Sequence, residues 1–449
     1  MRQLFGTDGI RGVAGEFPLD AATVFAAGAA LAHALLPQSA RRVLLGMDTR
    51  ESGPRLAAQL AAGLRLGGIE VVFAGVAPTP AVSYLARTHG FAAGVVISAS
   101  HNPWRDNGIK IFGSDGYKLA DRAELDIEKE IFARAGNSPT GDVVPLHAEE
   151  KLLSDYADWL AKEILLRGGE NFLRGMRLVV DCANGAAFRV GPQVLESLGA
   201  TVIATHSSPN GRNINDNCGA LHPEVVAAEV VAQKADLGIT FDGDADRVML
   251  ATAEGKVVNG DGVLLLAAEA LRAEGQLRGD TVVATTMSNM GLEIALAHRG
   301  IKMLRAPVGD KYVLEEMQKS GAVLGGEQSG HIIFSDRSPT GDGLLTALAV
   351  LCIVHDSGKP LAELVSDLKT FPQTIVNVRV REKVPLESLP EVQAAIRNAE
   401  TELAGKGRIN VRYSGTEKLA RVMVEAESED AMQQNANAIA NALREAIGE

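Results

Sequence analysis

The sequence predicts an α/β protein with three similar α/β domains of mixed or parallel sheet, followed by a smaller C-terminal α+β domain, around a central cleft. Three observations lead to this prediction. The 449 residues exceed what one hydrophobic core supports. Short apolar strands alternate with helical stretches through most of the chain. This pattern recurs three times, and each recurrence ends in a polar loop after an apolar strand.

The first recurrence begins with the glycine-rich stretch Phe5–Gly12, which we expect to be a loop that brings Arg11 to an anion. A helix is expected over residues 21–36, with Asp20 as its N-cap. The other expected elements are strands at 42–48, 69–74 and 91–96, helices at 54–66 and 79–87, and a polar loop at 49–53 that contains Arg50.

A hydroxyl group stands where the strand at 91–96 leaves the core. The run Ser98-Ala99-Ser100-His101-Asn102-Pro103 follows that strand, and its Asn-Pro pair stops any regular element. Ligands of α/β sheets bind at the carboxyl ends of strands, so Ser100 and His101 are candidate site residues. Residues 106–108 are expected to form a turn that returns Lys110 to the same edge. For this motif alone, a polar surface turn remains the alternative.

The second recurrence has strands at 177–181, 202–205 and 236–241, and the last delivers Asp242-Gly243-Asp244-Ala245-Asp246-Arg247. Three alternating carboxylates repel one another unless a cation lies among them, and hard oxygen ligands suit Mg²⁺. A calcium loop of the EF-hand type is excluded because Arg247 and Ala253 stand where glycine and an acid are needed. A haloacid-type phosphatase would have Thr or Val in place of Asp246. For the loop at 242–247, a polar surface turn remains the alternative interpretation.

The third recurrence has strands at 281–285, 301–304 and 322–324, and then the loop Gly325-Gly326-Glu327-Gln328-Ser329-Gly330-His331. Glu327 and Ser329 are suited to hydrogen-bond vicinal hydroxyls. His331 is a candidate acid or base, or a phosphate contact, against the alternative of a core histidine.

After residue 372 the pattern changes to strands at 374–380, 408–411 and 421–426 and helices at 386–403 and 431–447. The loop Arg412-Tyr413-Ser414-Gly415-Thr416-Glu417 combines a guanidinium, two hydroxyls and a glycine, which suits a non-reacting phosphate; an ordinary hairpin turn is the alternative. The expected buried face of the last helix consists of Ala431, Ala438, Ile439, Ala442, Leu443 and Ala446.

Composition narrows the classes of function. The net charge of −12 argues against nucleic acid as a main partner, although it leaves room for a local basic pocket. Neither a phosphate-binding P-loop nor GxGxxG occurs in the sequence. The three cysteines are far apart, which favours buried reduced thiols. The N-terminus lacks the apolar segment of a secretory signal and the Ala-rich stretch 20–41 is expected to be a core helix, so we expect a cytoplasmic protein without a membrane span.

Ser100 and the three aspartates suggest one chemistry. A serine hydroxyl is a poor nucleophile by itself. A phosphate carried on it is dianionic and calls for a cation, which the aspartates supply by holding Mg²⁺. Arg247 is then expected to help hold the same phosphate.

Four of these loops, at residues 98–103, 242–247, 326–331 and 412–417, resemble those of the α-D-phosphohexomutases, in the same order, and Phe5–Gly12 resembles the start of that family. Gln328 between Glu327 and Ser329 resembles the subgroup that acts on glucosamine phosphates. The resemblance departs at Tyr413 and Lys418, where prolines are expected, and this puts the stiffness of the phosphate loop in doubt.

The resemblance implies a phosphoserine at Ser100, which would share one Mg²⁺ per chain with Asp242, Asp244 and Asp246. It implies that Glu327 and Ser329 bind sugar hydroxyls. A distal phosphate would be bound by Arg412, Ser414, Gly415, Thr416 and Arg421. The residues implied to assist catalysis are Lys110, His101, Arg11, Arg247 and His331.

The resemblance also implies an isomerase that interconverts glucosamine 6-phosphate and glucosamine 1-phosphate through a sugar 1,6-bisphosphate, which also serves as activator, and that supplies UDP-N-acetylglucosamine synthesis. It suggests a homodimer and domains at 1–150, 151–254, 255–370 and 371–449. The alternatives are a phosphomannomutase/phosphoglucomutase with the same mechanism, a non-catalytic sugar-phosphate binder, and a phosphatase.

Overall fold

A computed structural model describes residues 3–6, 8–36, 40–134, 144–169, 171–414 and 418–449. The chain forms two compact units, one made of residues 1–285 and 306–365 and the other of residues 286–305 and 366–449. The first unit contains three sheets covered by helices, and the second contains a small antiparallel sheet. The predicted fold class is thereby confirmed.

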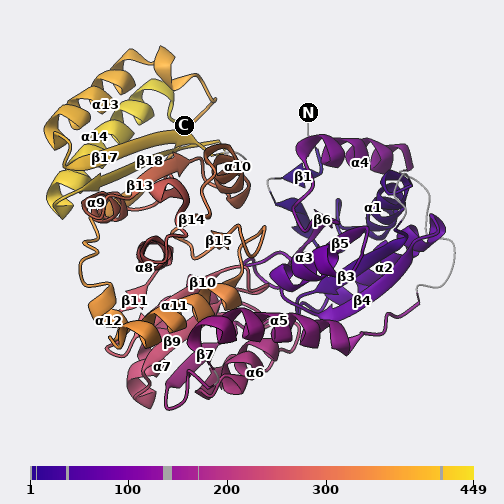
Figure 1. Ribbon diagram of the computed structural model, residues 1–449. Helices are drawn as coiled ribbons and strands as arrows, with labels where there is room; N and C mark the ends of the chain where they lie inside the picture. Colours follow the sequence, from indigo (N-terminus) through magenta and orange to yellow (C-terminus); the bar gives the residue numbers. More distant parts are fainter. Residues whose placement is uncertain (1–2, 7, 37–39, 135–143, 170, 415–417) are drawn as a thin grey trace. The chain divides into compact units, whose positions relative to one another are not determined.

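The first sheet has six strands in the order β1-β2-β6-β5-β3-β4 (Figure 1). Strand β3 pairs in parallel with β4 and β5, whereas β6, β2 and β1 continue the sheet in antiparallel fashion. The strands are β1 (Phe5–Gly6), β2 (Gly9–Val13), β3 (Arg42–Met47), β4 (Glu70–Val76), β5 (Ala93–Ile97) and β6 (Asp106–Gly113).

Helices cover both faces of this sheet, because alternate residues of a strand point to opposite sides. Val43 and Leu45 join a core with α1, α2 and α4, and Leu44 joins a second core with α3 and α5. Asp20 caps α1 as predicted, since its carboxylate accepts from the N–H groups of Ala22 and Thr23. The helices are α1 (Ala21–Ala34), α2 (Gly53–Leu66), α3 (Thr79–Thr88), α4 (Asp121–Arg134) and α5 (Glu150–Gly168).

Two sequence predictions in this sheet are wrong. The stretch Phe5–Gly12 is not a plain loop, because its described residues build the hairpin β1–β2, which β6 extends. Residues 106–108 are not a turn but the start of β6, which places Lys110 opposite Val96 of β5. The chain reverses earlier, within residues 98–105. Lys110 does return to the sheet, as expected. It does so on β6, whose first residues, Asp106-Asn107-Gly108, are typical of a turn and so did not predict a strand.

The second sheet has the order β11-β10-β9-β7-β8. Strands β7, β8 and β9 are parallel, and β10 folds back against β9. The elements are β7 (Arg177–Asp181), α6 (Val190–Ser197), β8 (Thr201–Thr205), η1 (Gly219–Leu221), α7 (Pro223–Gln233), β9 (Leu237–Phe241), β10 (Val248–Thr252) and β11 (Val257–Val258).

In the third region of the first unit, β12 pairs in parallel with β14, and β15 folds back on β14. Each polar loop predicted after a strand therefore leads into a returning strand, which the sequence analysis did not anticipate for β10 and β15. The elements are α8 (Gly260–Ala273), η2 (Arg278–Asp280), β12 (Thr281–Thr285), α10 (Asp310–Ser320), β14 (Leu324–Gly326), β15 (Ile332–Phe334), α11 (Gly343–Ser357) and α12 (Leu361–Leu364).

In the second unit, α13 and α14 pack on the antiparallel sheet β16-β18-β17 (Figure 1). The predicted buried face of α14 is confirmed except at Ala438, which is exposed. Ile439 and Leu443 are buried, Ala431, Ala442 and Ala446 are partly buried against the same core, and the core also includes Ala436, Ala440 and Ile447, which were not predicted. The elements of this unit are α9 (Met290–His298), β13 (Lys302–Ala306), β16 (Gln373–Arg379), η3 (Leu386–Ser388), α13 (Pro390–Leu403), β17 (Gly407–Tyr413), β18 (Leu419–Ala426) and α14 (Glu429–Ile447).

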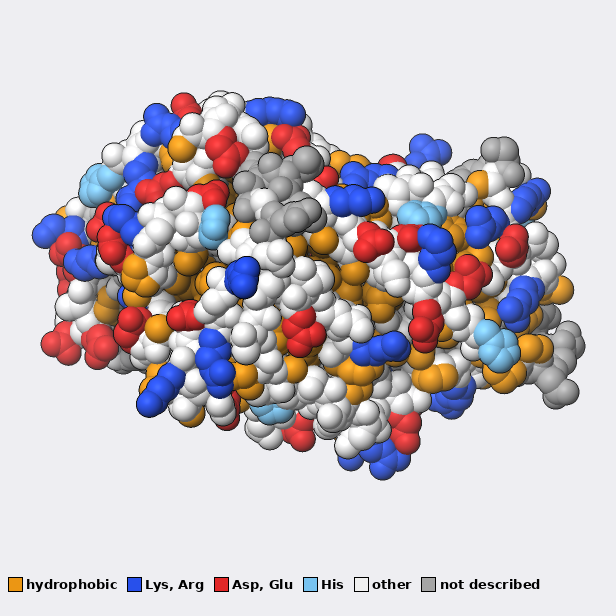
Figure 2. All heavy atoms as spheres, turned by 60° about the horizontal axis from the view of Figure 1, so that its bottom comes forward, with side chains coloured by type: hydrophobic (Ala, Val, Ile, Leu, Met, Phe, Trp, Pro, Cys, Tyr) orange, Lys and Arg blue, Asp and Glu red, His pale blue; other side chains and the backbone are white. Residues whose placement is uncertain are grey.

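On the face drawn in Figure 2, basic and acidic side chains of the described residues are interspersed. Every helix in the described ranges is too short or too polar to cross a lipid bilayer. The three cysteines, Cys182, Cys218 and Cys352, are buried, and none of them forms a disulfide.

Candidate active site

Ser100 lies in the loop between β5 and β6 with its side chain buried. Its φ of 53° is in the left-handed region, which a residue with a Cβ adopts only when its surroundings hold it there. Its N–H donates to the Oγ of Ser98 at 2.9 Å, and its own Oγ donates to Oδ2 of Asp242 at 2.6 Å. The structure thus joins the predicted serine to the predicted acidic loop.

Asp242, Asp244 and Asp246 follow β9 and are all buried. Their carboxylate oxygens come within 4.8 Å of one another. One oxygen of Asp244 and one of Asp246 have no hydrogen-bond partner in the described part of the chain, although they are inaccessible to solvent. Buried unsatisfied carboxylate oxygens are costly, and a hard cation satisfies them, so this donor set fits Mg²⁺.

Gly243 lets the two loops meet. A Cβ on this residue would lie 2.5 Å from the carbonyl oxygen of Ser100. Any larger residue would push the serine loop away from Asp242. The glycine between the first two aspartates is therefore part of the site's geometry.

Lys110 supplies the positive charge among the carboxylates. Its buried Nζ lies 2.8 Å from Asp244, 3.1 Å from Asp8 and 3.4 Å from Asp246. Burial alone lowers the pKa of this ammonium, but the neighbouring carboxylates outweigh it and raise the pKa well above its usual value. Burial raises the pKa of Asp244, but the charge and hydrogen bond of Lys110 together with the hydrogen bond from Thr79 outweigh it and lower the pKa below its usual value. In contrast, burial and the two neighbouring aspartates raise the pKa of Asp242.

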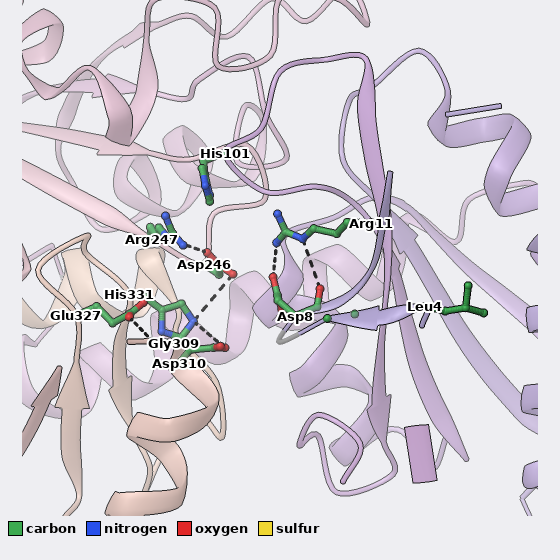
Figure 3. A pocket seen from close by; sticks show the side chains of 12 residues that line it. Leu4, Asp8, Arg11, His101, Asp246, Arg247, Gly309, Asp310, Glu327 and His331 are labelled. Atoms are coloured by element: carbon green, nitrogen blue, oxygen red, sulfur yellow. Dashed lines mark hydrogen bonds and ion pairs between the residues drawn. The ribbon is translucent and has the colours of Figure 1, made fainter. Parts of the chain in front are cut away.

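A cavity of about 360 Å³ opens beside these groups (Figure 3). Five predicted residues from three regions line it, together with Asp246: Arg11, His101, Arg247, Glu327 and His331. Arg11 comes from β2, His101 from the serine loop, Arg247 from the loop before β10, and Glu327 and His331 from the loop between β14 and β15. The strand ends of all three sheets of the first unit therefore contribute to one cavity.

The cationic side chains of the cavity are held in different ways. Arg11 donates to the carbonyl oxygen of Ala99 at 3.1 Å and forms an ion pair with Asp8. The buried Nε of Arg247 has no hydrogen-bond partner among the described residues, which leaves a donor for a ligand. Burial, with Arg247 and Arg11 nearby, lowers the pKa of His101 to about 4, so this imidazole is neutral at pH 7.

His331 has both ring nitrogens buried without a hydrogen-bond partner in the described ranges. Its Nε2 lies 3.7 Å from a carboxylate oxygen of Asp310 and 4.0 Å from one of Asp246 (Figure 3). The Oε1 of Glu327 accepts from the N–H of Gly309 at 3.0 Å. Ser329 does not line the cavity, although its buried Oγ lacks a partner among the described residues.

Several residues of the site were not predicted. Asp8 and Asp310 both form ion pairs with Lys118, and Thr79 donates to Asp244 at 2.6 Å. Arg50 donates to the Ser100 carbonyl oxygen at 2.9 Å. Thr79 and Arg50 stand just after β4 and β3, so the rule that ligands bind at carboxyl strand ends could have identified them. Lys118 and Asp310 carry no such signal, because their pairing joins segments 192 residues apart.

The predicted phosphate loop belongs to the second unit. Arg412 of β17 and Arg421 of β18 are directly opposite each other in the sheet register. Burial lowers the pKa of Arg412, and Arg421 lowers it further. Like charges placed face to face are unfavourable without an anion between them. Ser414 is buried, while Gly415 and Thr416 lie outside the described residues.

Tyr413, one of the two departures at this loop, is held by its hydroxyl, which donates to the carbonyl oxygen of Val384 at 2.6 Å. The other departure, Lys418, accepts at its carbonyl oxygen from the N–H of Val380 at 3.0 Å. Both residues that flank the loop are therefore tied to the 380–384 segment.

Four domain families match the chain in succession. Phosphoglucomutase/phosphomannomutase α/β/α domains I, II and III match residues 2–137, 154–255 and 259–371, and the C-terminal domain matches residues 375–442. A phosphoglucosamine mutase of Koribacter versatilis (strain Ellin345) is 57% identical over 458 residues, which cover 100% of this chain and 98% of the relative. The chain belongs to the phosphoglucosamine mutase family. A second family member, from Solibacter usitatus (strain Ellin6076), is 51% identical over the full length of both chains.

Solved structures extend this likeness beyond the phosphoglucosamine mutase family. A phosphoglucomutase/phosphomannomutase family protein of Burkholderia thailandensis superposes with a TM-score of 0.79 at 25% identity, covering 99% of this chain and 98% of that one. The N-acetylphosphoglucosamine mutase of Aspergillus fumigatus, solved with GlcNAc-6P and magnesium, shares the fold with a TM-score of 0.65 at 19% identity, covering 99% of this chain and 96% of that one.

Membership of the phosphoglucosamine mutase family confirms the predicted family and the predicted class of enzyme, an isomerase of the phosphohexomutase type. The roles of individual residues remain predictions.

Proposed function

We propose that this chain interconverts glucosamine 6-phosphate and glucosamine 1-phosphate, with a phosphoryl group carried on Ser100. The observation that supports this role is the hydrogen bond of 2.6 Å between the Ser100 Oγ and a buried carboxylate of the three-aspartate cluster, beside a cavity lined by Arg11, Arg247 and His331. The relatives that match over the full length of the chain are phosphoglucosamine mutases.

Asp242, Asp244 and Asp246, with an oxygen of the phosphorylated Ser100, would hold the proposed Mg²⁺, one per chain. When bound, such an ion supplies Lewis-acid stabilisation of the charge on the phosphoryl group. Arg247 is suited to bind the phosphoryl group, because its buried Nε forms no hydrogen bond among the described residues and lies 3.9 Å from Asp246. Lys110 holds Asp244 and Asp246 in place at 2.8 and 3.4 Å.

In the forward direction, the free 1-hydroxyl of glucosamine 6-phosphate attacks phosphorus. The bond between phosphorus and the Ser100 Oγ breaks, a bond to the sugar oxygen forms, and the hydroxyl proton passes to a base of the cavity. The product is glucosamine 1,6-bisphosphate. After the sugar turns around, the Ser100 Oγ attacks the 6-phosphorus, the bond between that phosphorus and O6 breaks, and O6 takes up a proton from an acid of the cavity, which leaves glucosamine 1-phosphate. His331 is suited to proton transfer, since neither of its ring nitrogens forms a hydrogen bond in the described ranges and Nε2 lies 3.7 Å from a carboxylate oxygen of Asp310.

The turn of the intermediate requires binding of the sugar and of a second, non-reacting phosphate. Glu327 lines the cavity and would bind sugar hydroxyls, together with Ser329. Arg412 and Arg421, two opposed guanidiniums, would bind the passive phosphate, with Ser414, Gly415 and Thr416. One reacting and one passive phosphate position are what a turn of the intermediate requires.

The test is a comparison of kcat/KM on glucosamine, glucose and mannose phosphates, with intact-mass measurement of the purified chain. We expect the amino sugar to be the best substrate and a mass increase of one phosphoryl group on Ser100. Ser100→Ala should lose both the modification and turnover, while Ser154→Ala, at an exposed serine of α5, should keep both. Preference for mannose or glucose phosphate, or full turnover by Ser100→Ala, would overturn the proposal. Stoichiometric release of inorganic phosphate would indicate a phosphatase.

The remaining parts of the proposal are a cytoplasmic location, activation by a sugar 1,6-bisphosphate, a homodimer, and domain boundaries near residues 150, 254 and 370. Light scattering of the purified chain tests the dimer. Burst kinetics with and without added bisphosphate test the activator.

A further inference from the structure

Arg50 is a fully buried arginine that the proposed reaction does not use. It stands in the loop between β3 and α2, and all five of its guanidinium N–H groups have partners within the chain. Nε donates to Asp48 at 2.8 Å. The two terminal nitrogens donate to four backbone carbonyl oxygens of a single segment, which belong to Ser100, Asn102, Pro103 and Asp106.

These bonds hold most of the chain reversal that carries Ser100. Between residues 100 and 106 the backbone lacks the pairing of a regular sheet, so its carbonyl groups need other donors. A planar guanidinium presents several donors at fixed angles, which a lysine ammonium cannot reproduce. Arg50 therefore contacts the loop along its whole path from Ser100 to the start of β6. Asn215 supports only its first part, because its Nδ2 donates to the carbonyl oxygens of Ser100 at 2.9 Å and Asn102 at 3.2 Å.

The carboxylate that pairs with Arg50 acts on the same loop from the other side. Asp48 accepts from the Oγ of Ser98 at 2.6 Å, and that Oγ accepts from the N–H of Ser100 at 2.9 Å. The N–H and C=O of Ser100 are thus both held by the Asp48–Arg50 pair, directly or through Ser98. This explains how Ser100 keeps its left-handed φ of 53°, which costs about 1–2 kcal/mol for a residue with a Cβ.

The loop that carries Arg50 is also attached to the second sheet, which carries the aspartates. The hydroxyl of Thr49 donates to the carbonyl oxygen of Asn184 at 2.5 Å, and the N–H of Glu51 donates to that of Gly211 at 2.9 Å. The carboxylate of Glu51 pairs with Arg212 at 2.8 Å. Residues on both sides of Arg50 therefore contact segments that follow β7 and β8.

We infer that Arg50 is a positioning residue for phosphoryl transfer: with Asp48 and Ser98 it sets the place of the Ser100 Oγ relative to Asp242, Asp244 and Asp246. This inference rests on the proposed function, in which Ser100 carries the phosphoryl group. Misplacement of a reacting atom by about 1 Å lowers the rate by about a hundredfold, although substrate binding is untouched.

The test uses two variants of the full chain, Arg50→Lys and Ser98→Ala, with Arg42→Lys as matched control. Arg42 stands at the opposite end of β3, and its side chain is 43% exposed. Ser98→Ala removes only one hydroxyl, so it still reports on the network if Arg50→Lys does not fold. All assays run well below the melting temperature of each variant, so that lost stability does not lower the rate.

We expect kcat to fall about a hundredfold in both variants, with KM for the sugar phosphate within about threefold of the unmodified chain. The double variant should lose less than the product of the two single losses, because both changes disrupt one network. Arg42→Lys should keep kcat and KM.

A second readout does not depend on activity. Amide hydrogen exchange of the segment 98–106 should be about tenfold faster in both variants and unchanged in Arg42→Lys. A change of kcat below threefold in folded Arg50→Lys and Ser98→Ala, or unaltered exchange of this segment, overturns the inference. If the unmodified chain and Arg42→Lys do not turn over glucosamine phosphates, the proposed function fails instead, while the exchange result still decides whether Arg50 orders the loop.

Discussion

Replacing Lys110 by Met tests whether one buried ammonium neutralises the acidic cluster. Its Nζ lies 2.8, 3.1 and 3.4 Å from carboxylate oxygens of Asp244, Asp8 and Asp246. At an effective dielectric constant of about 20, Coulomb's law gives about 5–6 kcal/mol for each of these contacts. Taking the ammonium out of water costs several kcal/mol, and removal of one partner from a buried pair costs about 3–5 kcal/mol. With cations removed by EDTA, we expect Lys110→Met to lower the free energy of unfolding by about 3–5 kcal/mol.

Mg²⁺ should narrow the difference in unfolding free energy between Lys110→Met and the unmodified chain, because the variant binds the cation without a competing ammonium. Each tenfold gain in Mg²⁺ affinity narrows it by about 1.4 kcal/mol at saturating cation. Urea unfolding followed by tryptophan fluorescence suits the measurement, since Trp104 and Trp159 both belong to the first unit.

The matched control for this experiment is Lys129→Met, because Lys129 forms an exposed pair with Asp126. It should cost less than about 1 kcal/mol. A loss below 1 kcal/mol for Lys110→Met, or a loss that Mg²⁺ does not change, would refute the reasoning.

Three further predictions concern separate parts of the chain. Burial raises the pKa of Asp342 to about 6, although the Tyr156 hydroxyl donates to its carboxylate. The folded chain therefore binds an extra proton between about pH 4 and 6. The stability that this proton contributes is lost as pH rises. Asp342→Asn should therefore gain about 2 kcal/mol relative to the unmodified chain between pH 4 and pH 7, measured by urea unfolding at both values; an equal difference at the two pH values would contradict this. Gly341→Ala should lower kcat at least tenfold in steady-state assays, because the new Cβ would lie 2.5 Å from the His331 ring. A kcat equal to that of the unmodified chain would contradict a need for this ring position. Arg412→Ala should raise KM for the sugar phosphate by about tenfold to a hundredfold in steady-state assays, since a charge-assisted bond to the passive phosphate contributes about 1.5–3 kcal/mol; an unchanged KM would exclude that role.

The sequence by itself determined the order of the polar loops and the chemistry of each. The alternating aspartates after an apolar strand were sufficient to predict a cation site, and the serine at the end of another strand was sufficient to predict the carrier of the phosphoryl group. The structure brings these residues together because parallel strands present their carboxyl ends at one edge, so short motifs and local periodicity carry the information about which loops meet. The chain length and the alternation of strands and helices also predicted the fold class.

Only the tertiary structure decided which groups neutralise and position those loops. Lys110 contacts Asp244 because β6 runs back along β5, whereas its sequence neighbours suggested a turn. Lys118 meets Asp310 across 192 residues, and Arg50 meets the carbonyl oxygens of a loop 50 to 56 residues later. Contacts of this kind depend on strand register and on the packing of whole sheets. No spacing within a motif encodes them, which is why Arg50, Lys118 and Asp310 escaped prediction, whereas the candidate residues within the polar loops did not.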